Sequence, residues 1–240
     1  MQYFELTCIA YLKKDITFKE SFEKISKYIS YSMAQDAKLK TIHKDIGFKY
    51  YTFGGFLPIE KEKIYLKGSS YRLTIRSIDE NLIETLSKEL RKNINNPNLI
   101  VVETNKKAVK QFFISELYSA TPVIITTENG FHWTRDKDGD ILKLQKQLQD
   151  NLEKKYQNFY AKKLTSSQNF IQLLEIKNQK PQTIQITKNG KKIRFFGNKF
   201  KIVPNEDKIS QKLAFLALGC GLGEKGSFGG GFCLAKGMEL

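Results

Sequence analysis

The sequence predicts an α+β protein of two tandem ferredoxin-like domains (βαββαβ, RRM-like), with a glycine-rich loop near the C-terminal end. Three observations predict this architecture. Strand and helix patterns follow the order strand, helix, strand, strand, helix, strand in both halves of the 240 residues. Hydrophobic residues make up 40% of the chain and 17 residues are Phe, which is enough apolar surface for a substantial core. Eight of the 16 glycines lie between positions 219 and 237, which predicts a single glycine-rich loop.

We expect the first domain to cover residues 1–118. Its first strand lies over 3–12, where apolar residues alternate at period two. A helix follows over 18–34, because Thr17 and Glu20 form a capping-box pattern and apolar residues recur at helical spacing. The other elements expected here are extended stretches over 48–57 and 63–78, a helix over 80–92 with Asp79 as N-cap, and strands over 99–104 and 108–118.

We expect the second domain to cover residues 119–240 and to repeat this order with an additional hairpin. A strand is predicted over 122–127, followed by an Asn129-Gly130 turn. A long helix is predicted over 141–163 from its apolar stripe. The remaining elements are strands over 170–176, 182–188 and 191–203, a short helix capped by Asp207, and a last strand over 229–236.

The chain is strongly basic, and the charge predicts a polyanionic partner. Lys and Arg number 40 against 25 Asp and Glu, a formal net charge of +15, which favours nucleic acid or an acidic membrane surface. The segment 177–201 carries eight basic residues and no acidic one. Because Phe195, Phe196 and Phe200 are interleaved with them, this hairpin is typical of RNA binding, although the aromatic rings could instead face the core. The predicted RNA-binding side chains are Lys188, Lys191, Lys192, Arg194 and Lys199.

Other classes of protein are disfavoured. The N-terminus lacks a basic region typical of a secretory signal, and no apolar run approaches the roughly 20 residues of a membrane span. Cys8, Cys220 and Cys233 are scattered, so we expect reduced, buried thiols and a cytoplasmic location. With only His43 and His132, and no pairs at ligand spacing, we expect no metal site and no cofactor.

The glycine-rich segment begins with the residues Gly-Leu-Gly-Glu-Lys-Gly-Ser over 221–227 and ends with Gly-Gly-Gly over 229–231. It is not a Walker loop, because no Gly-Lys-Ser/Thr is followed by a helix. Such a loop can approach a ligand closely and turn its N–H groups toward phosphate oxygens. The residues expected to hold RNA here are Gly221, Gly223, Lys225, Ser227, Gly229 and Gly231, with Glu224 in a structural role.

This loop resembles the C-terminal glycine motif of the RAMP superfamily, and more narrowly the CRISPR-associated endoribonucleases that cut precursor crRNA. The segments 71–77, 121–125 and 151–156 are similar to other parts of that family, so the resemblance covers nearly the whole chain. One departure is Gly230, where the family usually has a bulkier apolar residue. The resemblance implies metal-independent cleavage of CRISPR repeat RNA by 2′-hydroxyl attack, giving 2′,3′-cyclic phosphate and 5′-hydroxyl ends. The implied partners are precursor crRNA, other Cas effector-complex subunits and a second copy of the chain, with no membrane.

The resemblance also implies where the catalytic residues lie. His43 sits in a segment similar to the one that carries the family's active-site histidine, and the ordinary pKa of histidine suits proton transfer. Lys49 could donate to the developing charge, and Tyr31, or alternatively Tyr28, could assist. His132 is the second choice for catalysis. Two other readings remain open, a catalytically inactive RAMP-type subunit that holds crRNA and a generic RRM-like binder of single strands.

Overall fold

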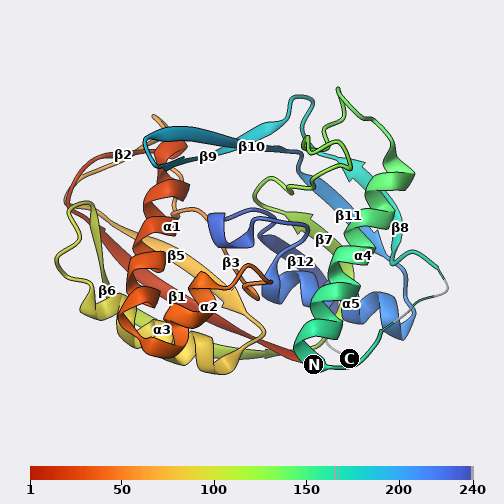
Figure 1. The fold of residues 1–240 in the computed structure, drawn as a ribbon, viewed down its shortest axis with the longest axis horizontal. Helices are drawn as coiled ribbons and strands as arrows, with labels where there is room; N and C mark the ends of the chain where they lie inside the picture. Colours follow the sequence, from red (N-terminus) through yellow and green to blue (C-terminus); the bar gives the residue numbers. More distant parts are fainter. Residues whose placement is uncertain (165, 167, 239–240) are drawn as a thin grey trace.

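Figure 1 shows the fold of the computed structural model, which describes residues 1–164, 166 and 168–238. The N-terminal half contains a four-stranded antiparallel sheet. Its strands, in spatial order, are β3 (Tyr51–Phe53), β5 (Ser70–Ser77), β1 (Gln2–Leu12) and β6 (Leu99–Lys110). Apolar side chains of α1 (Phe18–Gln35) and α3 (Glu80–Lys92) share one core cluster with this sheet.

The predicted helix starts are confirmed. Thr17 caps α1 by accepting a hydrogen bond from the Glu20 amide, and its hydroxyl donates to the Glu20 carboxylate at 2.7 Å. Asp79 caps α3 by accepting a hydrogen bond from the Leu82 amide. The short helix α2 (Ala37–Lys44) was not predicted, because Leu39 is its only buried residue and the segment has no apolar stripe.

The C-terminal half contains a second four-stranded antiparallel sheet. Its strands, in spatial order, are β12 (Cys233–Met238), β7 (Phe113–Ser119), β11 (Phe200–Pro204) and β8 (Ile171–Ile176). The helices α4 (Ile141–Tyr160) and α5 (Lys208–Cys220) contribute to its core, and Asp207 caps α5 as predicted. The strands of each sheet can be numbered 1 to 4 in chain order. The spatial order is then 2-3-1-4 in the N-terminal sheet and 4-1-3-2 in the C-terminal sheet, which is the same order read in opposite directions.

The structure corrects three strand predictions in the C-terminal half. Residues 122–127 form only isolated bridges, because the sheet begins instead with β7, which runs across the expected boundary at 118. The predicted strand 191–203 is two strands, β10 (Lys191–Gly197) and β11, which belong to different sheets. The last strand begins at Cys233 rather than 229, because the three preceding glycines belong to the loop.

A two-stranded hairpin of β9 (Gln182–Lys188) and β10 connects the two halves. It leaves the C-terminal half and lies across α1, at the top of Figure 1. Its buried residues Ile184, Ile186 and Phe195 belong to the N-terminal core cluster. The Thr187 amide also donates to the Glu23 carboxylate of α1 at 2.9 Å. A smaller pair, β2 (Ile16–Thr17) and β4 (Ile64–Tyr65), lies in the N-terminal half.

Arg76 forms a second connection between the halves. Its Nε donates to the Glu5 carboxylate at 2.7 Å, and its Nη1 donates to the Cys233 carbonyl oxygen of β12 at 2.6 Å. The guanidinium carbon lies 5.3 Å from the Tyr3 ring centroid and 4.7 Å from that of Phe232. Because this buried charge is paired, hydrogen-bonded and stacked, it fixes β12 against the N-terminal sheet.

The glycine loop, residues 221–232, passes between the two halves. It contains the 3₁₀ turn η1 (Gly226–Phe228), which lies next to β3. Gly229 has a φ of +87°, and a Cβ there would lie 2.5 Å from the Phe22 ring of α1. A Cβ on Gly231 would lie 1.9 Å from the Leu222 carbonyl oxygen. The loop is therefore glycine-rich because its backbone is packed, not because it is loose.

We expect Gly229→Ala to lower the free energy of unfolding by about 1–3 kcal/mol more than Gly68→Ala. Both glycines have a left-handed φ, but a Cβ on Gly68 would have no atom within 4 Å. The comparison therefore separates steric overlap with Phe22 from the backbone conformation itself. Urea unfolding of the two variants measures the difference, and equal losses would contradict the packing described for the loop.

Candidate functional site

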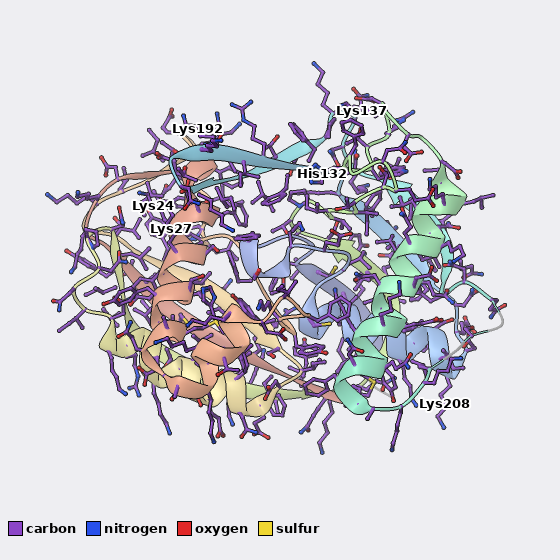
Figure 2. All side chains as sticks on the ribbon, viewed as in Figure 1. Lys24, Lys27, His132, Lys137, Lys192 and Lys208 are labelled. Carbon is purple, nitrogen blue, oxygen red and sulfur yellow. The ribbon has the colours of Figure 1, made fainter. Side chains whose placement is uncertain are left out.

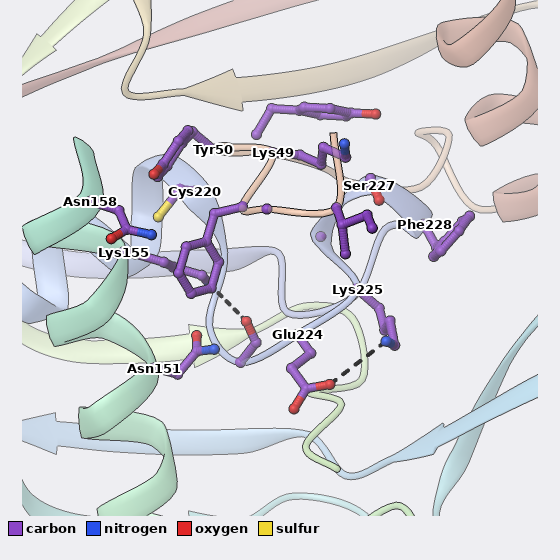
Figure 3. A pocket seen from close by; sticks show the side chains of 16 residues that line it. Lys49, Tyr50, Asn151, Lys155, Asn158, Cys220, Glu224, Lys225, Ser227 and Phe228 are labelled. Carbon is purple, nitrogen blue, oxygen red and sulfur yellow. Dashed lines mark hydrogen bonds and ion pairs between the residues drawn. The ribbon is translucent and has the colours of Figure 1, made fainter. Parts of the chain in front are cut away.

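A cavity of about 400 Å³ opens where the two halves and the glycine loop meet (Figure 3). One wall is the segment 46–51, which connects α2 to β3. A second wall is α4, through Asn151, Lys155 and Asn158. The third wall is the glycine loop, from Gly223 to Phe228. Each wall comes from a different part of the sequence, so the cavity exists only in the folded chain.

Lys155 holds the glycine loop against α4. Its side chain is buried, and its Nζ donates to the carbonyl oxygens of Gly221 at 2.8 Å and Gly223 at 2.7 Å. Burial lowers the pKa of this ammonium group. Two buried backbone acceptors would lose their partner without it, so Lys155 fixes the shape of the loop at the cavity.

Glu224 attaches the other side of the loop to residues 124–126. Its carboxylate accepts hydrogen bonds from the Thr126 amide at 3.1 Å and the Thr126 hydroxyl at 2.8 Å. Its own backbone amide donates to the Ile124 carbonyl oxygen. These bonds are consistent with the structural role expected for Glu224. The Lys225 Nζ lies 3.7 Å from the same carboxylate and 5.5 Å from the Phe195 ring centroid.

The structure separates the six loop residues expected to hold RNA into two groups. Gly223, Lys225 and Ser227 line the cavity. Gly221, Gly229 and Gly231 do not line it, and their backbone N–H groups donate to the carbonyl oxygens of Ala217, Gly226 and Pro122. The expectation that these three N–H groups face a phosphate is therefore wrong, because internal hydrogen bonds engage them.

A short run of amides at the cavity remains available. In the part of the chain that the structure describes, the backbone N–H groups of Lys225, Gly226 and Ser227 have no hydrogen-bond partner. Lys225 is left-handed, with a φ of +61°, and precedes the 3₁₀ turn. Successive N–H groups in such a conformation form a concave site that favours anions.

His43 and Lys49 lie together beside this cavity. His43 is exposed in the last turn of α2, one turn from the segment 46–51. The Lys49 Nζ donates to the carbonyl oxygens of Ile42 at 2.6 Å and His43 at 3.0 Å, and also to that of Asp45. Lys49 thus caps the C-terminal end of α2. Desolvation first, and then the Lys49 charge, lower the pKa of the His43 imidazole.

The two candidate tyrosines have different surroundings. Tyr28 is buried, and its hydroxyl donates to the Leu90 carbonyl oxygen at 2.6 Å and accepts from the Val101 amide at 3.0 Å. Tyr28 is a core residue, so it is wrong as the alternative to Tyr31. Tyr31 is 56% exposed on α1, and among the described residues no hydrogen bond or aromatic contact joins its ring to His43 or Lys49.

Four of the five basic side chains expected to bind RNA here are open to solvent. Lys188, Lys191, Lys192 and Arg194 are exposed, whereas Lys199 is half-buried and burial lowers its pKa. Figure 2 shows Lys192 on the same side of the molecule as Lys24 and Lys27 of α1. Phe195 of the hairpin is buried in the N-terminal core and Phe200 of β11 in the C-terminal core, whereas Phe196 of the hairpin is 38% exposed.

Sequence reasoning missed the site roles of Lys155, Asn151 and Asn158. Lys155 follows Leu152 by three positions and directly precedes Tyr156, both of which belong to the apolar stripe of α4. A lysine at that place is a signal for a buried ammonium group with specific acceptors, which could have identified it. Asn151 belongs to the segment 151–156 that resembles the family, but no pattern in the sequence places it or Asn158 at a site.

The cysteines, the metal-ligating side chains and the helices bear on the other classes of protein. Cys8, Cys220 and Cys233 are free and buried, as predicted, and burial raises the pKa of Cys8 and Cys233 to about 12. Among the described residues, no three His, Cys, Asp or Glu side chains gather where they could hold a metal ion. None of the described helices has the length and apolar character to cross a membrane.

Comparisons with known proteins agree with this arrangement. The chain is 28% identical over 241 residues to the CRISPR-associated endoribonuclease Cas6 2 of Methanocaldococcus jannaschii, and the match covers 92% of this chain and 97% of that protein. A solved structure described as CRISPR associated protein Cas6 shares the fold with a TM-score of 0.70 at 21% identity, over 98% of this chain and 99% of the other. A RAMP protein that binds different RNA substrates has a TM-score of 0.67 at 18% identity, over 97% and 99% of the two chains.

A family model gives the assignment. Residues 102–234 match the model for CRISPR associated protein Cas6, C-terminal. These residues include α4 and the glycine loop, which form two of the three walls of the cavity. Because this match covers more than half of the chain, the protein belongs to the Cas6 family.

Proposed function

We propose that this protein is an endoribonuclease that cleaves CRISPR repeat RNA within precursor crRNA. The observation that carries the proposal is the cavity between the halves, where an anion-binding run of amides faces the segment that follows His43. The similar protein of Methanocaldococcus jannaschii is named an endoribonuclease, which supports the same activity here.

In the proposed mechanism, the 2′-hydroxyl beside the scissile phosphate attacks in line without a metal ion. His43 removes the proton from this hydroxyl, because an imidazole with a lowered pKa is neutral near pH 7. The N–H groups of 225–227 and the Lys225 ammonium group hold charge on the phosphorane. The 5′ oxygen departs and takes up a proton from water, which leaves a 2′,3′-cyclic phosphate and a 5′-hydroxyl.

The geometry changes the role that we assign to Lys49. All three hydrogens of its ammonium group have carbonyl acceptors at the end of α2. We therefore propose that Lys49 is a positioning residue, which fixes the His43 backbone and lowers the imidazole pKa by its charge. Tyr31 remains a candidate to contact the sugar from the exposed face of α1.

We also propose that each half is a ferredoxin-like domain. The shared strand order supports this interpretation. The proposed boundary moves from 118 to residues 111–112, between β6 and β7, because β7 pairs with β11 and β12. Precursor crRNA is the proposed partner and the cytoplasm the proposed location, while binding to other Cas subunits and pairing of two copies stay predictions.

The direct test is cleavage of repeat RNA in excess EDTA. We expect the unmodified repeat RNA to be cut at one position. A single 2′-deoxy substitution before the scissile phosphate should abolish cutting, because the attacking hydroxyl is then missing. Gel analysis of end groups measures the cyclic phosphate. If the RNA binds but is never cut, with or without metal, the protein is the catalytically inactive crRNA-binding subunit instead.

We expect His43→Ala to reduce the single-turnover cleavage rate by about 10²–10⁴-fold, the usual contribution of general acid–base catalysis. RNA affinity should stay within a few-fold, because the loss concerns proton transfer. Lys40→Ala is the matched control, since Lys40 is an exposed residue of the same helix, one turn earlier. A His43→Ala enzyme that cleaves at the wild-type rate would exclude His43 as the base.

The pH dependence of cleavage should report on His43. A base works when neutral, so the rate should rise with pH through a midpoint below the ordinary histidine value of 6.5, because desolvation and then Lys49 lower the pKa. In Lys49→Met the midpoint should move upward, since the nearby positive charge is gone. Single-turnover rates across pH 4–8 measure both midpoints, and an unchanged midpoint in Lys49→Met would contradict the role given to Lys49.

A further inference from the structure

A second cavity, of about 230 Å³, lies next to the basic hairpin and outside the cavity of the glycine loop. Phe131, His132, Thr134, Lys137 and Phe196 line it, together with Asp136 and Pro181. We call it the Phe131–Phe196 pocket. Figure 2 places His132 and Lys137 on the same side of the molecule as Lys192 of the hairpin. The pocket is below the size that drug-sized ligands occupy, about 300 Å³ or more, so it suits one small ring system.

Aromatic side chains at this pocket are unusually exposed. Phe131 is 64% exposed and Phe196 is 38% exposed. Phe131 follows the tight turn at Asn129-Gly130, in which the Thr127 amide donates to the Phe131 carbonyl oxygen at 2.7 Å. Phe196 is on β10, with the opposite orientation to the buried Phe195. The backbone therefore holds two phenyl rings at the surface, where each offers a face for stacking.

Thr134 provides a polar group without a partner. The residue is only 3% exposed, and its hydroxyl has no hydrogen-bond partner among the described residues. Leaving a buried hydroxyl unsatisfied is unfavourable, so such a group in a native protein calls for an explanation. A ligand with hydrogen-bonding edges that entered the pocket would supply the missing partner after rotation of the Thr134 side chain.

The pocket lining carries the charges of Lys137 and Asp136, and aromatic contacts join it to the glycine loop. The Lys137 Nζ lies 5.9 Å from the Phe131 ring centroid. The His132 ring packs edge-on to Phe195 at 5.7 Å, and Phe195 in turn stacks on Phe228 of the loop at 5.5 Å. Lys225, which lines the loop cavity, also lies over Phe195. Aromatic contacts thus connect the loop to this pocket, with Lys225 at one end and Lys137 at the other.

We propose that the Phe131–Phe196 pocket binds one unstacked nucleobase of the RNA, a few nucleotides away from the bond held at the glycine loop. The exposed rings supply stacking, the Thr134 hydroxyl meets an edge of the base, and Lys137 faces the backbone. His132, the second choice for catalysis in the sequence, becomes part of this binding site. The inference rests on the proposed function, because it identifies the ligand as the RNA that the enzyme cleaves.

The test combines an abasic scan with a pocket variant. The probes are single-stranded oligoribonucleotides of the repeat sequence, blocked at the cleaved position by a 2′-deoxy sugar, each with one abasic nucleotide. We expect Phe196→Ala to weaken binding of the intact probe by about 5- to 100-fold, the range found for loss of base stacking. At one position, removal of the base should weaken binding to the wild type but have no further effect on binding to Phe196→Ala. The reason is that the contact between that base and the Phe196 ring is already missing in the variant. Fluorescence anisotropy measures each Kd.

Three controls make the result specific. Tyr11→Ala removes an aromatic side chain that is also 38% exposed, but on β1, and should leave all the Kd values unchanged. Phe131→Ala should reproduce the effect of Phe196→Ala at the same nucleotide. Thr134→Val keeps the shape and removes the hydroxyl, so it should weaken binding of the intact probe several-fold without lowering the melting temperature.

The outcomes separate this inference from the proposed function. Cleavage of unmodified repeat RNA by the wild type is measured in parallel. Suppose that the wild type cleaves RNA, but that at every abasic position the Kd still differs between the wild type and Phe196→Ala. The pocket proposal is then wrong and the proposed function stands. If the two Kd values agree at one position while no RNA is cut, the pocket is a base-binding site of a non-cleaving protein. Loss of affinity that is equal for all probes would mean that Phe196 acts only on the fold, which also overturns the proposal.

Discussion

The close packing of the glycine loop between the two halves is the constraint on which the rest of the structure depends. Gly229 lies against Phe22 of the N-terminal half, while the carbonyl oxygens of Gly221 and Gly223 accept from Lys155 of the C-terminal half. A side chain at Gly229 or Gly231 would overlap its neighbours, so only glycine brings the halves this close. The loop forms one wall of the candidate site, and the fixed distance between halves gives the cavity its shape.

The two halves also exchange elements, which makes their relative position rigid. The β9–β10 hairpin belongs to the C-terminal half in sequence but buries Ile184, Ile186 and Phe195 in the N-terminal core. Arg76 of the N-terminal sheet donates to β12. A site built from α2, α4 and the loop needs this rigidity, because catalytic groups on separate domains must hold their geometry to be effective.

Charge and chemistry are divided between different parts of the molecule. The exposed lysines of the hairpin lie on the surface, where they should govern RNA affinity and its dependence on salt. The groups proposed for catalysis, His43 and the amides of 225–227, lie at the junction of the halves, where desolvation lowers the His43 pKa. Lys49 belongs to neither group, since its ammonium hydrogens are taken by the end of α2.

The sequence by itself determined most of the local structure, because caps, apolar periodicity and turn residues act over a few positions. Thr17, Asp79 and Asp207 begin the predicted helices, and the two strands predicted to start at 182 and 191 pair as a hairpin. The family also followed from residues near one another in sequence, those of the loop. Only the tertiary structure decided which strands share a sheet, so it corrected residues 122–127 and moved β7 to the C-terminal half. It also decided which loop amides are free, that Tyr28 is a core residue, and that Lys155 and Thr134 face cavities, because those properties depend on contacts between distant segments.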